Sequence, residues 1–185
     1  MLGSTIDGDN GWSLIVTNNV PYRPDELLAV LERHEVLYVV IGGLAAELRG
    51  SPYVTQDVDV TPARTRDNFI RLAAALRELD ARLRVPDMEY PVEVPLDEQS
   101  FEQGTTWTYV TKHGYLDVAL LPDGTRGYED LRRAATREQL TDTLSISVAA
   151  LADVIRSKEA AGREKDRAVL PVLRQVLERS KKEKR

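Results

Sequence analysis

Three aspartates in this sequence could together bind divalent metal ions. Asp57 and Asp59 alternate with two valines, a pattern typical of a strand with one apolar and one polar face. Both carboxylates would then point the same way, from backbone positions about 6.5–7 Å apart. Two like charges at that spacing repel each other unless a cation lies between them. Because Mg²⁺ prefers carboxylate and phosphate oxygens, the pair is a candidate magnesium site.

The third aspartate, Asp117, is the single charged residue in the apolar run 115–121. An ionised side chain in such a strand needs a partner or a metal ion. Two divalent ions held about 3.5–4 Å apart by carboxylates can drive phosphoryl or nucleotidyl transfer. The three aspartates are therefore a candidate site for two Mg²⁺ ions.

Two glycines, Gly42 and Gly43, follow a buried apolar run and precede a short helical run. Glycine lets backbone N–H groups approach a phosphate closely, and the start of a helix is favourable for an anion. The pair is not a Walker A loop, because no GK[ST] follows, and it is not a GxGxxG motif. A simple turn would explain the glycines alone, and a solvent-facing strand would explain the aspartates alone. Their order along one chain favours a phosphate-binding site.

In this order the residues resemble the nucleotidyltransferase superfamily, which has the polymerase-β-like fold. The matching residues are Gly42-Gly43, Thr55–Asp59 and Asp117. The resemblance implies that the three aspartates hold two Mg²⁺ ions and that Asp117 also activates an acceptor hydroxyl. It further implies that the nucleotide, an NTP, is bound by Gly42, Gly43 and Thr55. Many relatives have serine at the second glycine position, so only backbone donors remain here.

The segment 151–166 resembles the AbiEii/MenT-type branch, whose members include toxins of toxin–antitoxin pairs. In that branch a lysine and an arginine contact the triphosphate, and Lys158 and Arg163 match their positions. Lys158 would thereby take part in catalysis, and Asp166 would belong to the nucleotide site. On a straight helix the two cations would diverge, but Gly162 ends the helix and could let both face one pocket. A solvated helix end is the alternative explanation.

These resemblances imply an Mg²⁺-dependent nucleotidyltransferase whose acceptor is an RNA, the 3′ end of tRNA, in a toxin with a cognate antitoxin. The whole chain has a net charge of −5, yet its last thirty residues contain eleven basic and five acidic side chains. Such a basic region could attract RNA or triphosphates. The alternatives are transfer to a small molecule such as an aminoglycoside, transfer to a protein hydroxyl, and a non-catalytic, antitoxin-like interaction module.

Mixed strands with flanking helices and a helical end predict an α/β (α+β) fold with a mixed-sheet nucleotidyltransferase core. The expected strands are 36–41, 57–60, 106–111, 115–121 and 144–148. The expected helices are 24–34, 44–48, 65–80, 128–135, 149–161 and 163–179. We expect an N-terminal arm at 1–20, a core at 21–148, and C-terminal helices at 149–185 that complete the site and end in a basic tail. The proline- and acid-rich segment 81–104 predicts loops with short strands.

The composition excludes several classes of site. The chain has no cysteine and two histidines, which excludes disulfides, thiolate zinc sites, iron–sulfur clusters and cysteine nucleophiles. No apolar run reaches the ~20 residues that span a bilayer. The first residues lack the basic and apolar regions of a signal peptide. We therefore expect a cytoplasmic protein with no membrane partner.

Overall fold

The computed structural model describes residues 20–101 and 104–183. The predicted arm, 1–20, lies outside them except for its last residue. Within the described residues, the strands are β1 (Tyr38–Ile41), β2 (Asp57–Pro62), β3 (Arg82–Leu83), β4 (Thr106–Thr111), β5 (Gly114–Ala119), β6 (Thr136–Thr141) and β7 (Leu144–Val148). The helices are α2 (Pro24–Arg33), α3 (Gly42–Leu48), α4 (Arg66–Glu78), α5 (Tyr128–Leu131), α6 (Leu151–Ala161) and α7 (Glu164–Glu183).

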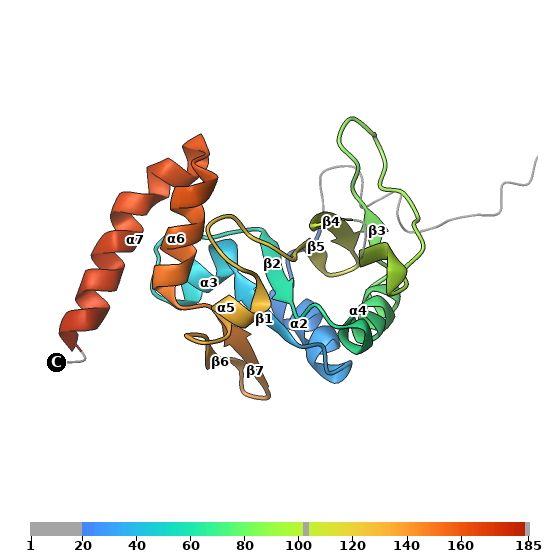
Figure 1. The fold of residues 1–185 in the computed structure, drawn as a ribbon, viewed down its shortest axis with the longest axis horizontal. Helices are drawn as coiled ribbons and strands as arrows, with labels where there is room; N and C mark the ends of the chain where they lie inside the picture. The colour runs from blue at the N-terminus through green and yellow to red at the C-terminus, as the bar shows by residue number, and fades with distance from the viewer. Residues whose placement is uncertain (1–19, 102–103, 184–185) are drawn as a thin grey trace, which may run out of the picture.

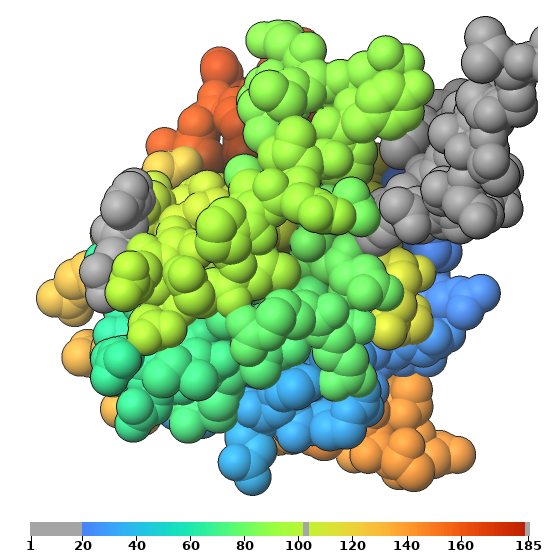
Figure 2. All heavy atoms as spheres, turned by 90° about the vertical axis from the view of Figure 1, so that its right-hand side faces the viewer, coloured from blue at the N-terminus to red at the C-terminus, as the bar shows by residue number. Residues whose placement is uncertain are grey.

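These described strands form one mixed sheet in the order β3-β4-β5-β2-β1-β7-β6. α6 packs against α7 and α3 at one end of the molecule, whereas α2 packs against α4 (Figure 1). The segment between β3 and β4 lies over the end of the molecule that carries α4 (Figure 2). The predicted fold class, α/β with a mixed sheet and flanking helices, is confirmed.

The middle of the sheet is β2, which lies between β1 and β5. β1 runs antiparallel to β2, and β5 runs parallel to it. Val58 and Val60 of β2 are buried in the core, while Asp57 and Asp59 on the other face remain partly accessible. The alternation in the sequence therefore does separate the core face of this strand from the face that carries the aspartates.

β1 begins at Tyr38, two residues later than predicted. The N–H of the preceding residue, Leu37, pairs with a side chain, while its carbonyl still accepts a backbone hydrogen bond from Ala63 N–H at 2.8 Å. Leu37 N–H donates to Asn68 Oδ1 at 2.7 Å, and Asn68 Nδ2 donates to the Leu37 carbonyl at 2.9 Å. Asn68 is fully buried on α4 and also donates to the Ala63 carbonyl at 2.9 Å. One amide side chain thus connects α4 to the start of β1 and the end of β2.

We expect Asn68→Leu, a change of similar volume, to destabilise the protein by about 2–5 kcal/mol. Leucine would leave the Leu37 N–H and the Ala63 carbonyl without the partners that Asn68 provides, and an unsatisfied buried polar group costs about 1–3 kcal/mol. Urea unfolding followed by circular dichroism measures the change. An unchanged unfolding midpoint would show that the Asn68 hydrogen bonds are dispensable.

The helix predicted at 128–135 is wrong beyond Leu131, and β6 was not predicted at all. Residues 136–141 are mostly polar and form an edge strand that pairs only with β7, so they show no apolar alternation. Arg49, at the end of α3, holds this edge. Its guanidinium contacts Glu138 and Thr136 of β6 and donates to the carbonyls of Val148 and Ala149.

Other element boundaries differ less. α3 begins at Gly42, so the glycine pair forms the first turn of the helix instead of preceding it. α7 continues to Glu183, beyond the predicted 179. The segment 81–104 contains the short strand β3 and a 3-10 turn at Gln99–Phe101, which agrees with loops and short strands. No helix in the described ranges has the length and apolar character needed to cross a membrane.

Candidate active site

The structure brings the three predicted aspartates together. Asp59 of β2 lies directly opposite Asp117 of β5 in the parallel ladder. Asp57 is two residues earlier on the same face of β2, and all three side chains line one cavity. Paired residues of neighbouring strands lie side by side, so the register of β2 and β5 makes the carboxylates converge.

Asp57 and Asp59 each accept a hydrogen bond from a nearby segment. Thr55 Oγ1 donates to Asp57 Oδ1, and the backbone N–H of Gly43 donates to the Asp59 carboxylate. Burial raises the pKa of Asp59 to about 7, helped by the negative charges of Asp57 and Asp117. The ionised form of Asp59 therefore has too little positive charge around it to stabilise it.

The negative charge of Asp117 is also not fully compensated by its neighbours. Burial raises the pKa of Asp117, although a hydrogen bond from Thr108 opposes that rise. Its Oδ1 atom is buried and has no hydrogen-bond partner within the described residues. Lys165 and Arg84 are near enough for their charges to lower the pKa of Asp117, but only as weaker contributions. An unpaired buried carboxylate oxygen of this kind is a natural ligand for a cation.

The residues at this site fit a hard divalent cation. In residues 20–101 and 104–183, no three or more His, Cys, Asp or Glu side chains are already arranged as a metal-binding cluster. Without a cation the three negative charges repel one another. Each carboxylate instead accepts a hydrogen bond from a different residue, namely Thr55, Gly43 or Thr108. The chemistry nevertheless suits Mg²⁺, because the donors are carboxylate oxygens, one of them orphaned, on two adjacent strands.

The glycine pair allows the start of α3 to lie against these acidic side chains. Gly42 has φ +63°, and a Cβ added there would lie 1.9 Å from Asp59 Oδ2. A Cβ added at Gly43 would lie 2.6 Å from the Thr55 Cβ. A serine at this second position would therefore collide with Thr55. The two glycines are explained by close approach to the site and not by a turn alone.

Lys158 and Arg163 share one carboxylate. Lys158 Nζ lies 3.0 Å from Asp166 Oδ1, and Arg163 Nε lies 2.6 Å from Asp166 Oδ2. Gly162 adopts the left-handed conformation that ends α6, so the chain turns between the two cations. Burial would raise the pKa of Asp166, but hydrogen bonds from Arg163 and Lys158 outweigh it and lower that pKa. Asp166 is fully buried, which favours a role in positioning the cations over direct contact with a nucleotide.

Two cavities meet at the aspartates, which we call cavity A and cavity B. They have volumes of about 280 Å³ and about 260 Å³, respectively. Both are lined by Gly42, Asp59, Asp117, Lys158 and Arg163. Cavity A extends to β4, the segment 121–125 and α6, whereas cavity B extends to α3, the segment 51–55 and α7. A reaction between two substrates requires two such subsites that share the reacting groups.

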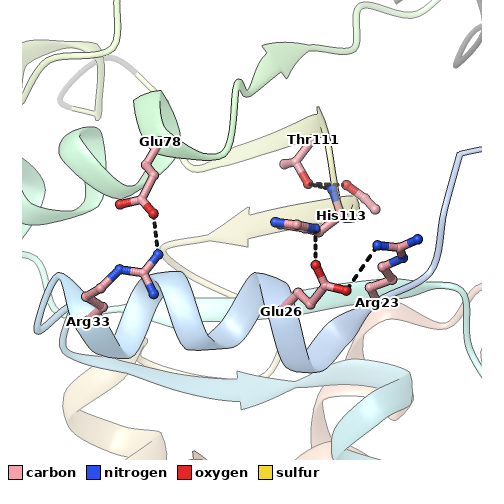
Figure 3. A network of polar contacts seen from close by, with 7 residues as sticks. Arg23, Glu26, Arg33, Glu78, Thr111 and His113 are labelled. Carbon is pink, nitrogen blue, oxygen red and sulfur yellow. Dashed lines mark hydrogen bonds and ion pairs between the residues drawn. The ribbon is translucent and has the colours of Figure 1, made fainter. Parts of the chain in front are cut away.

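Ion pairs and a backbone hydrogen bond connect the segment before α2 to the turn between β4 and β5 (Figure 3). Glu26 contacts Arg23 and His113, each at 3.1 Å, and Arg33 contacts Glu78 of α4. The backbone N–H of Arg23 also donates to the His113 carbonyl, at the turn between β4 and β5. Exposed ion pairs contribute little stability singly, but the two pairs of Glu26 act together with this backbone bond at the start of α2, whereas the Arg33–Glu78 pair joins the end of α2 to α4.

Sequence reasoning missed two residues near the aspartates. Thr108 pairs with Asp117 in the β4–β5 ladder, and the predicted hairpin around 112–114 could have supplied this register. Tyr22 is partly exposed, and its pKa rises to about 12 through burial and the charges of Glu47, Asp57 and Asp59. No sequence pattern pointed to Tyr22, because it lies far from the motifs along the chain.

Comparison with known proteins places the fold. The lincomycin-bound lincosamide antibiotic adenylyltransferase LnuA matches with a TM-score of 0.56 and 12% identity, over 85% of this chain and 99% of that one. The antibiotic-resistance factor ANT(2″)-Ia matches with a TM-score of 0.46 and 13% identity, over 93% and 97%. No family model and no curated protein matches the sequence. On the strength of the first match, this chain has the fold of a nucleotidyltransferase.

Proposed function

We propose that this chain is a divalent-metal-dependent nucleotidyltransferase, which moves a nucleoside monophosphate from an NTP to an acceptor hydroxyl. One observation carries the proposal: Asp57, Asp59 and Asp117 together line cavity B, and Asp59 and Asp117 also line cavity A. The cations Lys158 and Arg163 line the same two cavities. The fold shared with an adenylyltransferase supports the same reaction class.

Asp57, Asp59 and Asp117 would hold Mg²⁺, and a bound ion would neutralise phosphate charge and polarise the reacting phosphorus. Lys158 and Arg163 would bind the triphosphate and stabilise pyrophosphate as it leaves. Because the Asp166 carboxylate is bonded to both Lys158 and Arg163, these two side chains would be preorganised for this task. Residues 149–185 would in this way complete the site of the 21–148 core.

Asp117 would accept the proton of the attacking hydroxyl in addition to holding Mg²⁺, because it lies opposite Asp59 and lines both cavities. The acceptor oxygen forms a bond to the α-phosphorus, and the bond from that phosphorus to the bridging oxygen breaks. The nucleotide is thereby joined to the acceptor, and pyrophosphate is released.

For the acceptor we propose an RNA, the 3′ end of tRNA, in a toxin that has a cognate antitoxin. The resemblance of 151–166 to the AbiEii/MenT-type branch supports this choice. Exposed basic side chains along α7, among them Lys165, Arg167 and Arg179, also support it. Phosphate contacts from such side chains would make binding sensitive to salt.

A small hydroxylated amine is the second candidate acceptor, and cavity A provides the observation that favours it. Asp123 and Asp153 line this cavity in addition to Asp59 and Asp117. Carboxylates attract ammonium groups and repel phosphates, so this side of the site suits a cationic acceptor. The named substrate of LnuA, a lincosamide antibiotic, is likewise a small molecule.

The proposal is tested by incubating the protein with each α-labelled NTP, Mg²⁺ and either total RNA or small aminated acceptors such as tobramycin and lincomycin. We expect label in one acceptor class and no incorporation from γ-labelled NTP. Loss of transfer at high salt would favour RNA. Label in neither class would contradict the proposal, as would transfer that persists when Asp57→Ala and Asp59→Ala are combined. A non-catalytic module would keep its partner binding in that double variant.

A further inference from the structure

We propose that Tyr53 and Val54 form a stacking subsite for the nucleobase, so that the NTP lies in cavity B with its base between these residues and α7. The inference rests on the proposed function, because it presupposes a nucleotide substrate. It adds the location of the base and the kind of contact that recognises it.

Tyr53 and Val54 are large apolar side chains left in solvent at the edge of the site. Tyr53 is 45% exposed and Val54 is 80% exposed, and both line cavity B. Single exposed apolar residues are common on protein surfaces. Two in a row, on the segment that leads into Asp57, call for a functional explanation.

The lining of cavity B combines charged and apolar side chains. The charged ones include the three aspartates, together with Lys158, Arg163 and Lys165. The apolar ones are Ala46 of α3, Val169 and Leu173 of α7, and the exposed pair Tyr53 and Val54. A nucleoside triphosphate has the same combination, with a flat base at one end and a charged triphosphate at the other.

The segment that carries Tyr53 is held in place. Ser51 is buried, and its Oγ accepts a hydrogen bond from the Tyr53 N–H at 3.2 Å. A positioned aromatic ring can stack on a base without losing much conformational freedom. Ser51 and Thr55, each two residues from Tyr53, are polar side chains of the same segment that line the cavity.

Cavity A is a poorer place for the base. Among the described residues, its lining includes no tyrosine, tryptophan or phenylalanine, and it adds the carboxylates of Asp123 and Asp153, the second of which is paired with Arg156. The charge of Asp123 would repel a triphosphate. If the NTP occupies cavity B, cavity A remains for the acceptor, next to the same Asp117.

The test compares the binding of a non-hydrolysable NTP with that of inorganic tripolyphosphate, both with Mg²⁺, by isothermal titration. We expect Tyr53→Ala to weaken NTP binding about 10-fold, the range found when an aromatic platform is removed. Its binding of tripolyphosphate should stay within about twofold of the wild type, because phosphate contacts do not involve the ring. Tyr53→Phe keeps the ring and should bind the NTP like the wild type. In turnover, Tyr53→Ala should raise the KM for NTP and leave kcat nearly unchanged.

Tyr90→Ala is the matched control, since Tyr90 is 56% exposed and lines neither cavity. It should change none of these values. If Tyr53→Ala weakens NTP and tripolyphosphate equally, or neither, the stacking subsite is wrong. With normal transfer by the wild type, that result leaves the proposed function intact. Absence of any transfer by the wild type would instead overturn the proposed function.

Discussion

Asp59→Asn is expected to stabilise the metal-free protein and at the same time to abolish nucleotidyl transfer. Burial and the charges of Asp57 and Asp117 raise the pKa of Asp59 from 3.8 to about 7, so an ionised carboxylate here is unfavourable. An amide keeps an oxygen for the Gly43 N–H and removes the charge. We expect a gain of about 1–4 kcal/mol at pH 8, which raises the melting temperature by about 2–4 °C for each kcal/mol.

The sign of this effect depends on pH. The pKa of Asp59 is higher in the folded protein than the ordinary value of 3.8, so folding favours its protonated form. The contribution of Asp59 to the stability of the wild type therefore falls as pH rises from about 4 to about 7. The advantage of Asp59→Asn should be small at pH 4 and complete above about pH 7. Thermal unfolding in EDTA across this range measures it.

Transfer by Asp59→Asn should fall at least about 100-fold, because a charged ligand of the metal ions is lost. Mg²⁺ should stabilise the wild type more than the variant. Asp142→Asn changes an exposed aspartate in the β6–β7 turn and should alter neither stability nor transfer. A less stable Asp59→Asn at pH 8 would show that the ionised carboxylate is not unfavourable in the metal-free protein. A variant that still transfers nucleotide would show that Asp59 is not an essential metal ligand.

Gly42→Ala is expected to reduce transfer about 100-fold or more, through displacement of the Asp59 carboxylate. The added Cβ would lie 1.9 Å from Asp59 Oδ2, far inside contact distance, so the carboxylate must move. Misplacing a reacting group by about 1 Å can cost about 100-fold in rate. The backbone φ of +63° adds strain of about 1 kcal/mol for any residue with a Cβ.

Gly50→Ala separates the two effects of that substitution. Gly50 also has a positive φ, +94°, but an added Cβ would meet only Val176 Cγ1, at 3.6 Å. Both variants should therefore lose a similar amount of stability from backbone strain, measured by urea unfolding. Only Gly42→Ala should lose kcat/KM. Equal losses of activity in both variants would mean that strain, and not the position of Asp59, controls the reaction.

The parts of the fold that sequence reasoning predicted are those with a strong apolar pattern. β1 and β2 are short, but their valines are buried in the middle of the sheet, and such strands show either continuous apolar residues or clear alternation. β6 has no such pattern because it is a polar edge strand that Arg49 holds from another element. Contacts between distant segments of this kind leave no local signal.

The same limit applies to the site. The types and order of Asp57, Asp59 and Asp117 predicted a cluster, and the parallel register of β2 and β5 provides it. The sequence could not show that Asp166 is fully buried, with both its oxygens bonded to Lys158 and Arg163. Burial depends on packing between α6 and α7, so it was accessible only from the structure.

The central claim is that the three aspartates together hold divalent cations beside a nucleotide. Anomalous diffraction from crystals grown with Mn²⁺ and a non-hydrolysable NTP tests it most directly. We predict manganese peaks in contact with the carboxylates of Asp57, Asp59 and Asp117, with the triphosphate next to Lys158 and Arg163. Manganese bound only elsewhere, with these carboxylates bare in the presence of nucleotide, would contradict the account.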